Sequence, residues 1–527
     1  MPSPFDRSLS RRAFLGASAA VALVACSGGK GSTGAPTVTS TGPLPPVPAL
    51  PSDPFTLGVA SGCPGPDGFV LWTRLAPEPM QGGGMPEVRV PVRWMVGADD
   101  AMRDVVQEGV FVTGPDVAHT VHAIIGGLDP DRPYWYRFSV GDWETPIART
   151  RTFPAENSSP QQMRFGFASC QNFRDGYYTA WGDVAADGDL DFVAFLGDYI
   201  YESGVQGAVR AHDIPEVITL PEYRNRYALY RSDPLLRSAH ASVPWIVTWD
   251  DHEVDNNYQG NAPESTSAVT DPQAFLARRA AAYKAWWEHM PTRLAPPTGP
   301  DFAIYRGYEY GDLARINMLD TRQYRTDQPC SDTDIGALCD AAQEPATTLI
   351  GADQERWLAE RFSTTPAKWN ILAQQIVFSR LAFGTGPGAA YNLDQWDGYP
   401  VSRDRVLAMM AGASNPVVIT GDIHASGVSD IKRDFDDPAS PVVGTEFVGT
   451  SISSNGAALG AVIPTALESN PHLKWADASK RGWVRCEVTP DAWRADYRLV
   501  EDATKEGAPV TTAKSWVVES GRPVREA

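Results

Sequence analysis

A chain of 527 residues with 43% apolar residues and 16 tryptophans is long enough for two or more domains, and its composition excludes disorder over most of its length. Its formal net charge of −19 excludes a general nucleic-acid-binding surface, which needs clustered lysine and arginine. The six cysteines contain no CxxC pair and no Cys/His finger spacing, which argues against a structural zinc site.

The first 52 residues predict export rather than a folded domain. SRRAFL at 10–15 is a twin-arginine pattern, and the apolar stretch at 13–25 is too short to span a bilayer. LVAC at 23–26 resembles a lipobox in which Cys26 carries lipid, and the alternative is an ordinary signal peptide with a chance cysteine. We expect a signal peptide at 1–26, a flexible Gly/Ser/Thr/Pro tether at 27–52, and an extracytoplasmic protein, periplasmic or secreted.

Residues 53–157 contain short alternating apolar runs separated by Gly, Pro and Asp turns. This spacing predicts an all-β sandwich, the fold of immunoglobulin-like modules of roughly 100 residues. The segment LDPDRPYWYRF at 128–138 resembles the fibronectin type III pattern of a turn that leads into a Tyr-rich strand. We interpret this domain as a packing module beside a catalytic domain, with carbohydrate or partner binding as the alternative.

From 158 to 520, predicted strands and helices alternate, which is typical of a layered α/β fold with helices outside the sheets. Apolar residues with helical periodicity occupy 221–236, 272–289 and 354–362. Predicted strands occupy 303–310, 313–319, 369–377, 417–420, 445–453, 482–488 and 493–499.

Four apolar runs in this region end in polar groups that can bind a metal ion. The most informative is DLDFVAFLGDYIYE at 189–202, which reads as a strand buried on both faces that breaks at Gly197. The others are FGFASCQNF at 165–173, PWIVTWDDHEVDNNY at 244–258 and PVVITGDIHAS at 416–426. Because side chains beyond the carboxyl ends of buried strands line the functional crevice of an α/β sheet, the runs predict a site for more than one ion.

The side chains after the first two runs favour a redox-capable ion. Asp198 can offer one oxygen to each of two ions. The phenolate of Tyr201 and the thiolate of Cys170 favour ferric iron over magnesium. The alternatives are a turn aspartate, a core tyrosine and a small buried cysteine.

The last two runs add carboxylates and imidazoles. Asp251 offers an oxygen ligand, and His252 beside it can bind phosphate or protonate a leaving group. Asp422 and His424 are two residues apart, so in an extended segment they face one side and can bind neighbouring ions. An acidic loop and a chance DxH pair are the alternatives.

Taken in order, the motifs SC, GDYIYE, WDDHEVDNN, GDLARINMLDTRQYR and GDIH resemble those of the alkaline phosphatase D family, the PhoD-like metallophosphoesterases. The similarity extends from FTLGVASG at 55–62 to GTEFVGTSISSNG at 444–456. It implies a fibronectin-like N-terminal domain, followed by a calcineurin-like catalytic domain with four layers, α/β/β/α. It also implies an alkaline phosphatase that hydrolyses phosphomonoesters, phosphodiesters or both with iron and calcium.

The resemblance also implies roles for individual residues. Iron would be held by Cys170, Asp198, Tyr201 and His424. Calcium would be held by Asp198, Asp251 and Asp422, with Asn257 as a further neighbour. The phosphate would contact His252 and either Arg322 or Arg403, and a metal-activated hydroxide would attack phosphorus directly. The broader superfamily has DxH, GNH[DE] and GHxH in these places, and the additional aspartates here favour calcium over zinc.

The remaining expectations concern cysteines, partners and rival functions. Cys330 and Cys339 lie nine apart in a polar loop that a disulfide can close in an oxidising compartment, whereas Cys63 and Cys486 look isolated. We expect a monomer that acts on a phosphate ester and meets a membrane only through a lipid anchor. One alternative is a phosphodiesterase of the same fold, phospholipase D-like or specific for teichoic acid. Another is a non-catalytic surface-binding lipoprotein.

Overall fold

The computed structural model of the protein describes residues 43–331, 333–364 and 367–527. The expected signal peptide, the start of the tether and Cys26 therefore lie outside the described residues. Within these ranges, no helix combines the length and the apolar character that crossing a bilayer requires.

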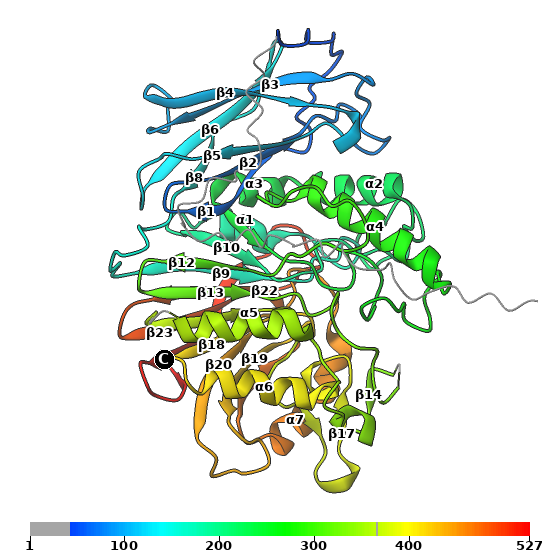
Figure 1. Ribbon diagram of the computed structural model, residues 1–527, viewed down its shortest axis with the longest axis vertical. Coiled ribbons are helices and arrows are strands. Elements are labelled where there is room, and N and C mark those ends of the chain that lie inside the picture. The colour runs from blue at the N-terminus through cyan, green and yellow to red at the C-terminus, as the bar shows by residue number, and fades with distance from the viewer. Residues whose placement is uncertain (1–42, 332, 365–366) are drawn as a thin grey trace, which may run out of the picture.

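Two central sheets lie face to face, with helices on both outer sides (Figure 1). In order, the ten-stranded sheet contains β25 (Arg525–Glu526), β24 (Val510–Glu519), β23 (Ala492–Val500), β22 (Arg481–Val488), β9 (Met163–Ala168), β10 (Phe192–Phe195), β11 (Trp245–Val247), β1 (Val59–Gly65), β2 (Gly68–Arg74) and β5 (Thr120–Ile125). The seven-stranded sheet contains β12 (Arg306–Tyr310), β13 (Ala314–Met318), β15 (Trp369–Ala373), β18 (Pro416–Thr420), β20 (Val442–Val448), β19 (Ser426–Lys432) and β21 (Leu473–Asp477).

The α-helices are α1 (Thr179–Ala186), α2 (Leu220–Arg231), α3 (Pro234–Ser242), α4 (Pro272–His289), α5 (Gly351–Thr364), α6 (Pro400–Met410) and α7 (Ile463–Ser469). Helices α1 to α4 cover the ten-stranded sheet, and α5 and α6 cover the seven-stranded sheet (Figure 1). This is the expected α/β/β/α arrangement. Short 3-10 helices are η1 (Pro115–Val117), η2 (Asp340–Gln343), η3 (Gly386–Gly388), η4 (Trp396–Gly398) and η5 (Ala457–Ala461). A small sheet of β14 (Ile335–Gly336), β17 (Ala390–Asn392) and β16 (Ala382–Phe383) lies at the periphery.

Strand β10 shows why its sequence is a continuous apolar run. Its four residues are all buried, and they alternate between two cores. Val193 and Phe195 pack in the core shared with the helices, whereas Phe192 and Ala194 pack in the core between the two sheets. Because the strand is buried on both faces, it has no position for a polar side chain before it ends at Phe195.

The predicted helical stretch at 221–236 is divided into α2 and α3. The break falls at Asp233, whose side chain accepts hydrogen bonds from the amides of Leu235 and Leu236 and so caps α3. Pro234 follows as the first residue of α3, where its missing N–H costs nothing but prevents α2 from continuing. The other two predicted helices occur as expected, and α4 has the predicted bounds 272–289.

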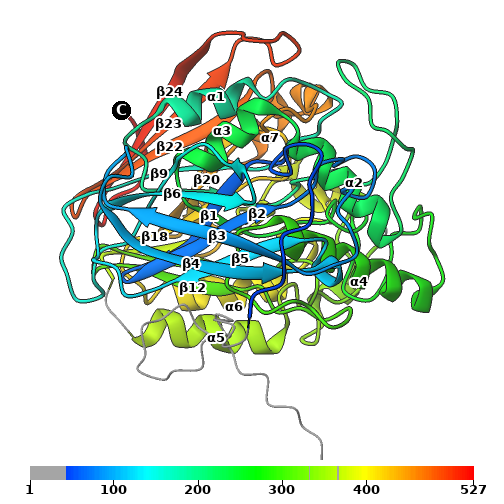
Figure 2. The ribbon, with the colours of Figure 1, turned by 90° about the horizontal axis from the view of Figure 1, so that it is seen from above.

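The N-terminal strands form a sandwich whose second sheet is separate. It consists of β4 (Val105–Thr113), β3 (Val90–Gly97), β6 (Pro133–Val140), β7 (Trp143–Glu144) and β8 (Ala148–Arg151), and it lies above the rest of the molecule in Figure 1 and in front in Figure 2. The sandwich's other strands, β1, β2 and β5, belong to the ten-stranded sheet because β1 pairs in parallel with β11, through Gly62 and Trp245.

Polar contacts reinforce this continuity between the N-terminal strands and α4. Trp72 of β2 and Thr120 of β5 both donate hydrogen bonds to the carbonyl of Glu288, at 3.1 and 2.8 Å. The guanidinium of Arg74 lies 2.9 Å from Nε2 of His289. The predicted packing module is therefore joined to the predicted catalytic domain by backbone pairing as well as by side chains.

Candidate active site

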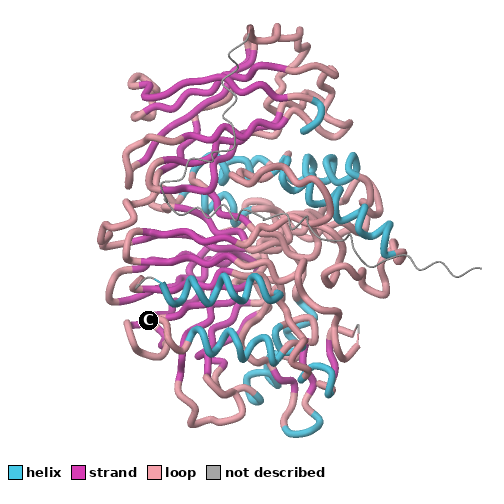
Figure 3. Tube along the Cα trace, in the orientation of Figure 1, coloured by secondary structure: helices cyan, strands magenta, loops and turns pink. Residues whose placement is uncertain are grey.

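Loops gather beside the ends of the central strands (Figure 3). Strands β9, β10 and β11 are parallel neighbours, so the residues that follow them lie side by side. Cys170 follows β9, Asp198 follows β10, and Asp250 and Asp251 follow β11. Asp422 and His424 follow β18 of the other sheet.

The candidate ligands form three adjoining triads. The ligand atoms within each triad lie within 4.8 Å of one another: Cys170, Asp198 and His424; Asp198, Asp251 and His252; Asp250, Asp251 and Asp422. Asp198 belongs to two triads, as does Asp251, so adjacent triads share a carboxylate. This geometry places five of the candidate metal ligands from the sequence together with His252, and adds Asp250, which the motif analysis did not assign.

Tyr201 lies at the first triad. Its hydroxyl donates to Asp198 Oδ2 at 2.9 Å and lies 3.0 Å from His424 Nε2. Burial raises the pKa of the Tyr201 phenol and of the Cys170 thiol well above their ordinary values, and the Asp198 carboxylate raises both pKa values further. Both groups therefore hold protons that a strongly polarising ion would displace.

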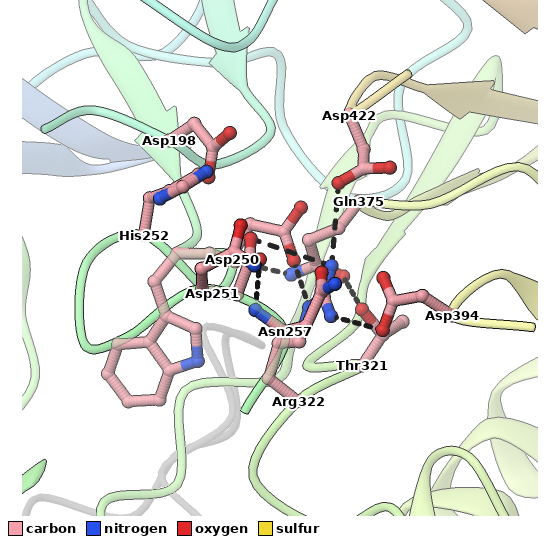
Figure 4. A network of polar contacts seen from close by, with 12 residues as sticks. Asp198, Asp250, Asp251, His252, Asn257, Thr321, Arg322, Gln375, Asp394 and Asp422 are labelled. Carbon is pink, nitrogen blue, oxygen red and sulfur yellow. Dashed lines mark hydrogen bonds and ion pairs between the residues drawn. The ribbon is translucent and has the colours of Figure 1, made fainter. Parts of the chain in front are cut away.

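Arg322 lies among the carboxylates at the other end of the site (Figure 4). Its side chain is fully buried, and its Nε donates to Asp250. Its Nη1 donates to Asp394 at 2.8 Å, and its Nη2 lies 3.4 Å from Asp422 and 3.5 Å from Asp251. One guanidinium thus contacts four carboxylates, and it lies beneath the site rather than extending into solvent.

His252 is held by a carboxylate and by a ring. Its Nδ1 lies 2.6 Å from Glu202 Oε2, and its ring centroid lies 4.1 Å from that of Tyr201. Burial lowers the pKa of His252, but Glu202, Asp198 and Asp251 outweigh it, so the pKa is raised well above its ordinary value. Because Glu202 occupies Nδ1, Nε2 is the nitrogen left for a substrate.

A buried glutamate fixes the two loops that carry Asp198 and Asp251. The carboxylate of Glu253 accepts hydrogen bonds from the backbone amides of Asp198 at 3.1 Å, Tyr199 at 2.6 Å and Asp250 at 2.8 Å. Burial raises the pKa of Glu253 to about 7, against the opposite effect of these amides. Its position in the DDHE motif was visible in the sequence, but the amides that it binds were not.

Two further partners come from a loop that the motif analysis did not use. Gln395 donates to Asp422 Oδ2 at 2.7 Å, and Asp394 binds both Arg322 and Arg325. These residues precede η4 in a segment without an apolar run, so periodicity gave no signal for them.

The structure separates the two candidate phosphate-binding arginines. Arg322 lies in the carboxylate cluster, whereas Arg403 lies on α6, pairs with Asp397 and has its guanidinium 5.3 Å from the Phe435 ring.

Asn257 lies between the site and the loop that contains the cysteine pair. Its backbone amide donates to Asp251 Oδ2 at 2.7 Å, and its side chain donates to Glu264 at 3.3 Å and to Asp334 at 2.9 Å. Asp334 lies between Cys330 and Cys339, which form a disulfide.

The backbone at the site is strained. Five candidate residues have positive φ angles, a region that non-glycine residues rarely adopt: Cys170, Asp198, Asn257, Asp422 and His424. Gly197 precedes Asp198 with φ +117°, and a Cβ at this glycine would lie 2.5 Å from Asp250 Cβ. The strand ends therefore turn sharply to present their side chains, and the close approach of two loops requires glycine.

Two buried carboxylate oxygens indicate that the site can bind metal ions, and this evidence does not depend on any sequence motif. Asp198 Oδ1 and Asp251 Oδ1 are buried and make no hydrogen bond in the described structure. Buried carboxylate oxygens are normally paired, because an unpaired one loses its hydration without compensation. Both residues are shared by two triads. Asp251 Oδ1 has a long ion pair with Arg322 Nη2 at 3.5 Å, whereas Asp198 Oδ1 has no hydrogen-bond partner among the described residues, so a cation would supply the missing interaction.

Comparisons with known proteins identify the family of the chain. The family model described as PhoD-like phosphatase matches residues 165–497, and the model of the PhoD-like phosphatase N-terminal domain matches residues 42–154. The chain belongs to the PhoD-like phosphatase family. It is 48% identical to alkaline phosphatase D of Bacillus subtilis (strain 168) over 484 residues, which cover 90% of this chain and 82% of that protein.

A solved structure titled "Structure of PhoD" superposes on this PhoD-like chain with a TM-score of 0.87 at 46% identity, covering 91% of this chain and 93% of the other. This match confirms the expected α/β fold and the family resemblance. Membership of this family makes the protein a phosphoric ester hydrolase of a metal-dependent class, and it argues against the alternative of a non-catalytic binding lipoprotein.

Proposed function

We propose that the protein hydrolyses phosphomonoesters, phosphodiesters or both at the three triads, with iron at the Cys170 end and calcium at the carboxylate end. The observation that carries this proposal is the sharing of Asp198 and Asp251 between adjacent triads, since a shared carboxylate can hold two ions roughly 3.5 to 4 Å apart. Bound ions would supply Lewis acidity toward the phosphoryl oxygens and toward a water nucleophile.

The iron assignment rests on donor chemistry. Cys170, Tyr201, His424 and Asp198 combine a thiol, a phenol, an imidazole and a carboxylate around one point. Thiolate and phenolate ligands favour a redox-capable ion of high charge. Asp198, Asp251 and Asp422, by contrast, offer oxygen ligands that suit calcium, and Asn257 adds an amide nearby.

His252 is the candidate general acid. Glu202 holds Nδ1 and raises the pKa of the imidazole, so that Nε2 can donate a proton to the oxygen of the leaving alcohol. The Tyr201 ring, whose centroid lies 4.1 Å from that of His252 at an interplanar angle of 31°, packs against the imidazole in this orientation. The enzyme requires no serine or threonine nucleophile in this scheme.

The contacts of Arg322 support a role other than the phosphate binding that the motif suggested. Because its guanidinium is already bound to carboxylates, we propose that it orients Asp250, Asp251 and Asp422 and neutralises part of their charge. Contact with a phosphoryl oxygen is then left to His252 and the metal ions. Arg403, paired with Asp397, has no assigned part in the reaction.

Elemental analysis and a visible spectrum of the purified exported protein test the metal assignment. We expect about one iron and one or two calcium ions per chain, with a charge-transfer band from the thiolate or phenolate ligand. Zinc or manganese without such a band would retain a metallophosphoesterase but remove Cys170 and Tyr201 from the ligand set.

The loaded protein should then be assayed with p-nitrophenyl phosphate and bis(p-nitrophenyl) phosphate under one set of conditions. A higher kcat/KM for the diester would favour the phosphodiesterase alternative, which includes phospholipid and teichoic-acid substrates. A higher kcat/KM for the monoester would favour a broad alkaline phosphatase. Failure to hydrolyse either ester by metal-loaded protein would contradict the proposal.

We also propose that twin-arginine export places the enzyme outside the cytoplasm with a lipid anchor on Cys26. The support is the sequence pattern at 10–26. We expect the native chain in the membrane fraction and a Cys26→Ser variant in the soluble extracytoplasmic fraction. Fractionation with Cys63→Ser as the control checks this expectation, and a Cys26→Ser variant that stays with the membrane would contradict the anchor.

A further inference from the structure

A pocket that is separate from the three triads lies beside the first half of α5, the helix on the outer side of the seven-stranded sheet. Its volume is about 820 Å³. Four aromatic side chains line it: Phe302, Tyr305, Tyr324 and Trp357. Charged side chains at the same pocket are Asp301, Asp353, Arg356 and Glu360. None of these residues is a member of the three triads or one of the side chains described as bound to the triads.

The aromatic rings are steeply inclined to one another. The centroids of Tyr305 and Tyr324 are 5.8 Å apart with an interplanar angle of 76°, and those of Tyr305 and Trp357 are 5.2 Å apart at 59°. Phe302 and Tyr305 are buried, whereas Tyr324 and Trp357 are half-buried. Phe302 belongs to the hydrophobic core, where its ring lies near those of Trp249 and Trp286. The half-buried rings of Tyr324 and Trp357 are therefore the more accessible aromatic surfaces of the pocket.

The rim of the pocket is acidic. The Asp301 and Asp353 side chains are 89% and 84% exposed, and Glu360 adds a third carboxylate. Arg356 pairs with Asp353, so, with Arg279 counted, three carboxylates at the rim face two guanidinium groups. Asp301 also pairs with Arg279, which lies behind it.

Burial and nearby carboxylates raise the pKa values of the two tyrosines in the pocket. Burial is the largest cause that raises the pKa of Tyr305, and Asp353 and Asp320 raise it further. Burial likewise raises the pKa of Tyr324, with added effects from Asp320 and Asp301. Arg356 acts in the opposite direction on Tyr305 and lowers its pKa. Asp353 lies in the first turn of α5, where it also offsets the positive end of the helix dipole.

A pocket of this kind has a specific chemical preference. The faces of aromatic rings attract cations, and the attraction grows when the cation is large and weakly hydrated, as in quaternary ammonium groups. Carboxylates at the rim add Coulomb attraction at longer range. A neutral sugar could bind to the aromatic rings but would not be attracted by the carboxylates. The charge of a ligand should therefore distinguish organic cations from sugars in their affinity for this pocket.

We propose that this pocket is a binding site for an organic cation, a quaternary or protonated alkylammonium group enclosed by Tyr305, Tyr324 and Trp357. It is separate from the hydrolytic site, but one loop serves both. Arg322 and Tyr324 are two residues apart, and Arg322 enters the carboxylate cluster whereas Tyr324 lines the pocket. The site would hold a cationic part of a large substrate, or of the surface on which the substrate lies, while the ester is cleaved elsewhere.

Choline and its uncharged isostere 3,3-dimethylbutan-1-ol form a matched pair of probes for this site. Binding to the full metal-loaded protein can be measured by saturation-transfer NMR and by calorimetry. We expect saturable choline binding with a dissociation constant in roughly the millimolar range, and at least about tenfold weaker binding of the neutral isostere. Glucose at the same concentration should not displace choline.

Substitutions of residues that line the pocket test whether choline binds there. Trp357→Leu should weaken choline binding about tenfold, and Asp353→Asn at least about threefold, because they remove a ring face and a rim charge respectively. Trp143→Leu, at a half-buried tryptophan in the N-terminal β7, is the matched control and should bind choline normally. All three variants should hydrolyse p-nitrophenyl phosphate at the native rate, which also reports that they are folded.

Three results would overturn the proposal. Equal binding of choline and its neutral isostere would show an apolar pocket without cation preference. Unchanged choline affinity in both Trp357→Leu and Asp353→Asn would place any binding elsewhere. Displacement of choline by glucose, or glucose binding without choline binding, would make the pocket a carbohydrate site. Asp353→Asn changes an exposed side chain, so it keeps the test decisive if Trp357→Leu fails to fold.

Discussion

An Asp198→Asn variant is expected to lose its iron and at least about 100-fold in kcat/KM, since loss of even an outer-sphere partner of a metal ligand costs 10- to 100-fold. Asp198 is the carboxylate shared by the first two triads, and one of its oxygens has no hydrogen-bond partner. The amide of asparagine keeps the shape of the side chain but removes the charge. Metal content and kcat/KM for p-nitrophenyl phosphate, measured on the same sample, check this result.

The control for Asp198→Asn lies at the start of the same segment, residues 189–202. Asp189→Asn removes an exposed carboxylate before β10 and should leave metal content and rate unchanged. Cys170→Ala should lose iron and the charge-transfer band in parallel with Asp198→Asn. An Asp198→Asn protein with native iron content and native kcat/KM would refute the shared-ligand assignment.

Replacement of Arg322 by Met is expected to destabilise the metal-free protein by about 3–5 kcal/mol, the usual cost when one partner of a buried ion pair is removed. The loss takes the guanidinium away from Asp250, Asp251 and Asp422, whereas Asp394 keeps its ion pair with Arg325. Bound cations restore part of that charge balance, so the loss should be smaller in metal-loaded protein. Denaturant unfolding with a chelator and with added metal measures both values.

Arg403→Met is the matched control, because Arg403 is also buried and also paired with an aspartate. Its loss in unfolding free energy should be the same with and without metal, since its partner Asp397 contacts none of the three triads in the described contacts. If Arg322→Met also lost the same stability with and without metal, Arg322 would not be coupled to the metal-binding carboxylates.

The layers and most of the candidate ligands were predictable because they follow from short-range patterns. A strand buried on both faces requires a run such as that at 192–195, and its end must release the chain into a loop where polar groups collect. The motif order then identified the family. Asp198, Asp251 and Asp422 could all be named from their positions after such runs.

The remaining features depend on contacts between distant segments. Asp394 and Gln395 reach the site from a loop before η4 that has no periodic pattern. The role of Arg322 depends on how many carboxylates converge on it, which no single motif records. The division of 221–236 into two helices was visible as Pro234, but apolar periodicity alone extended the helix through it.

The pairing of β1 with β11 has a consequence for any attempt to separate the N-terminal strands from the catalytic part. An excision at residue 157 would turn β11 into a sheet edge with unpaired amides and carbonyls, next to the apolar surface that Trp72 and its neighbours now cover. Exposed edges of this kind recruit strands from other molecules and lead to aggregation. The N-terminal strands therefore serve the enzyme as a built-in protective cover, and shuffling of this module among relatives would require its recipient to provide an equivalent strand.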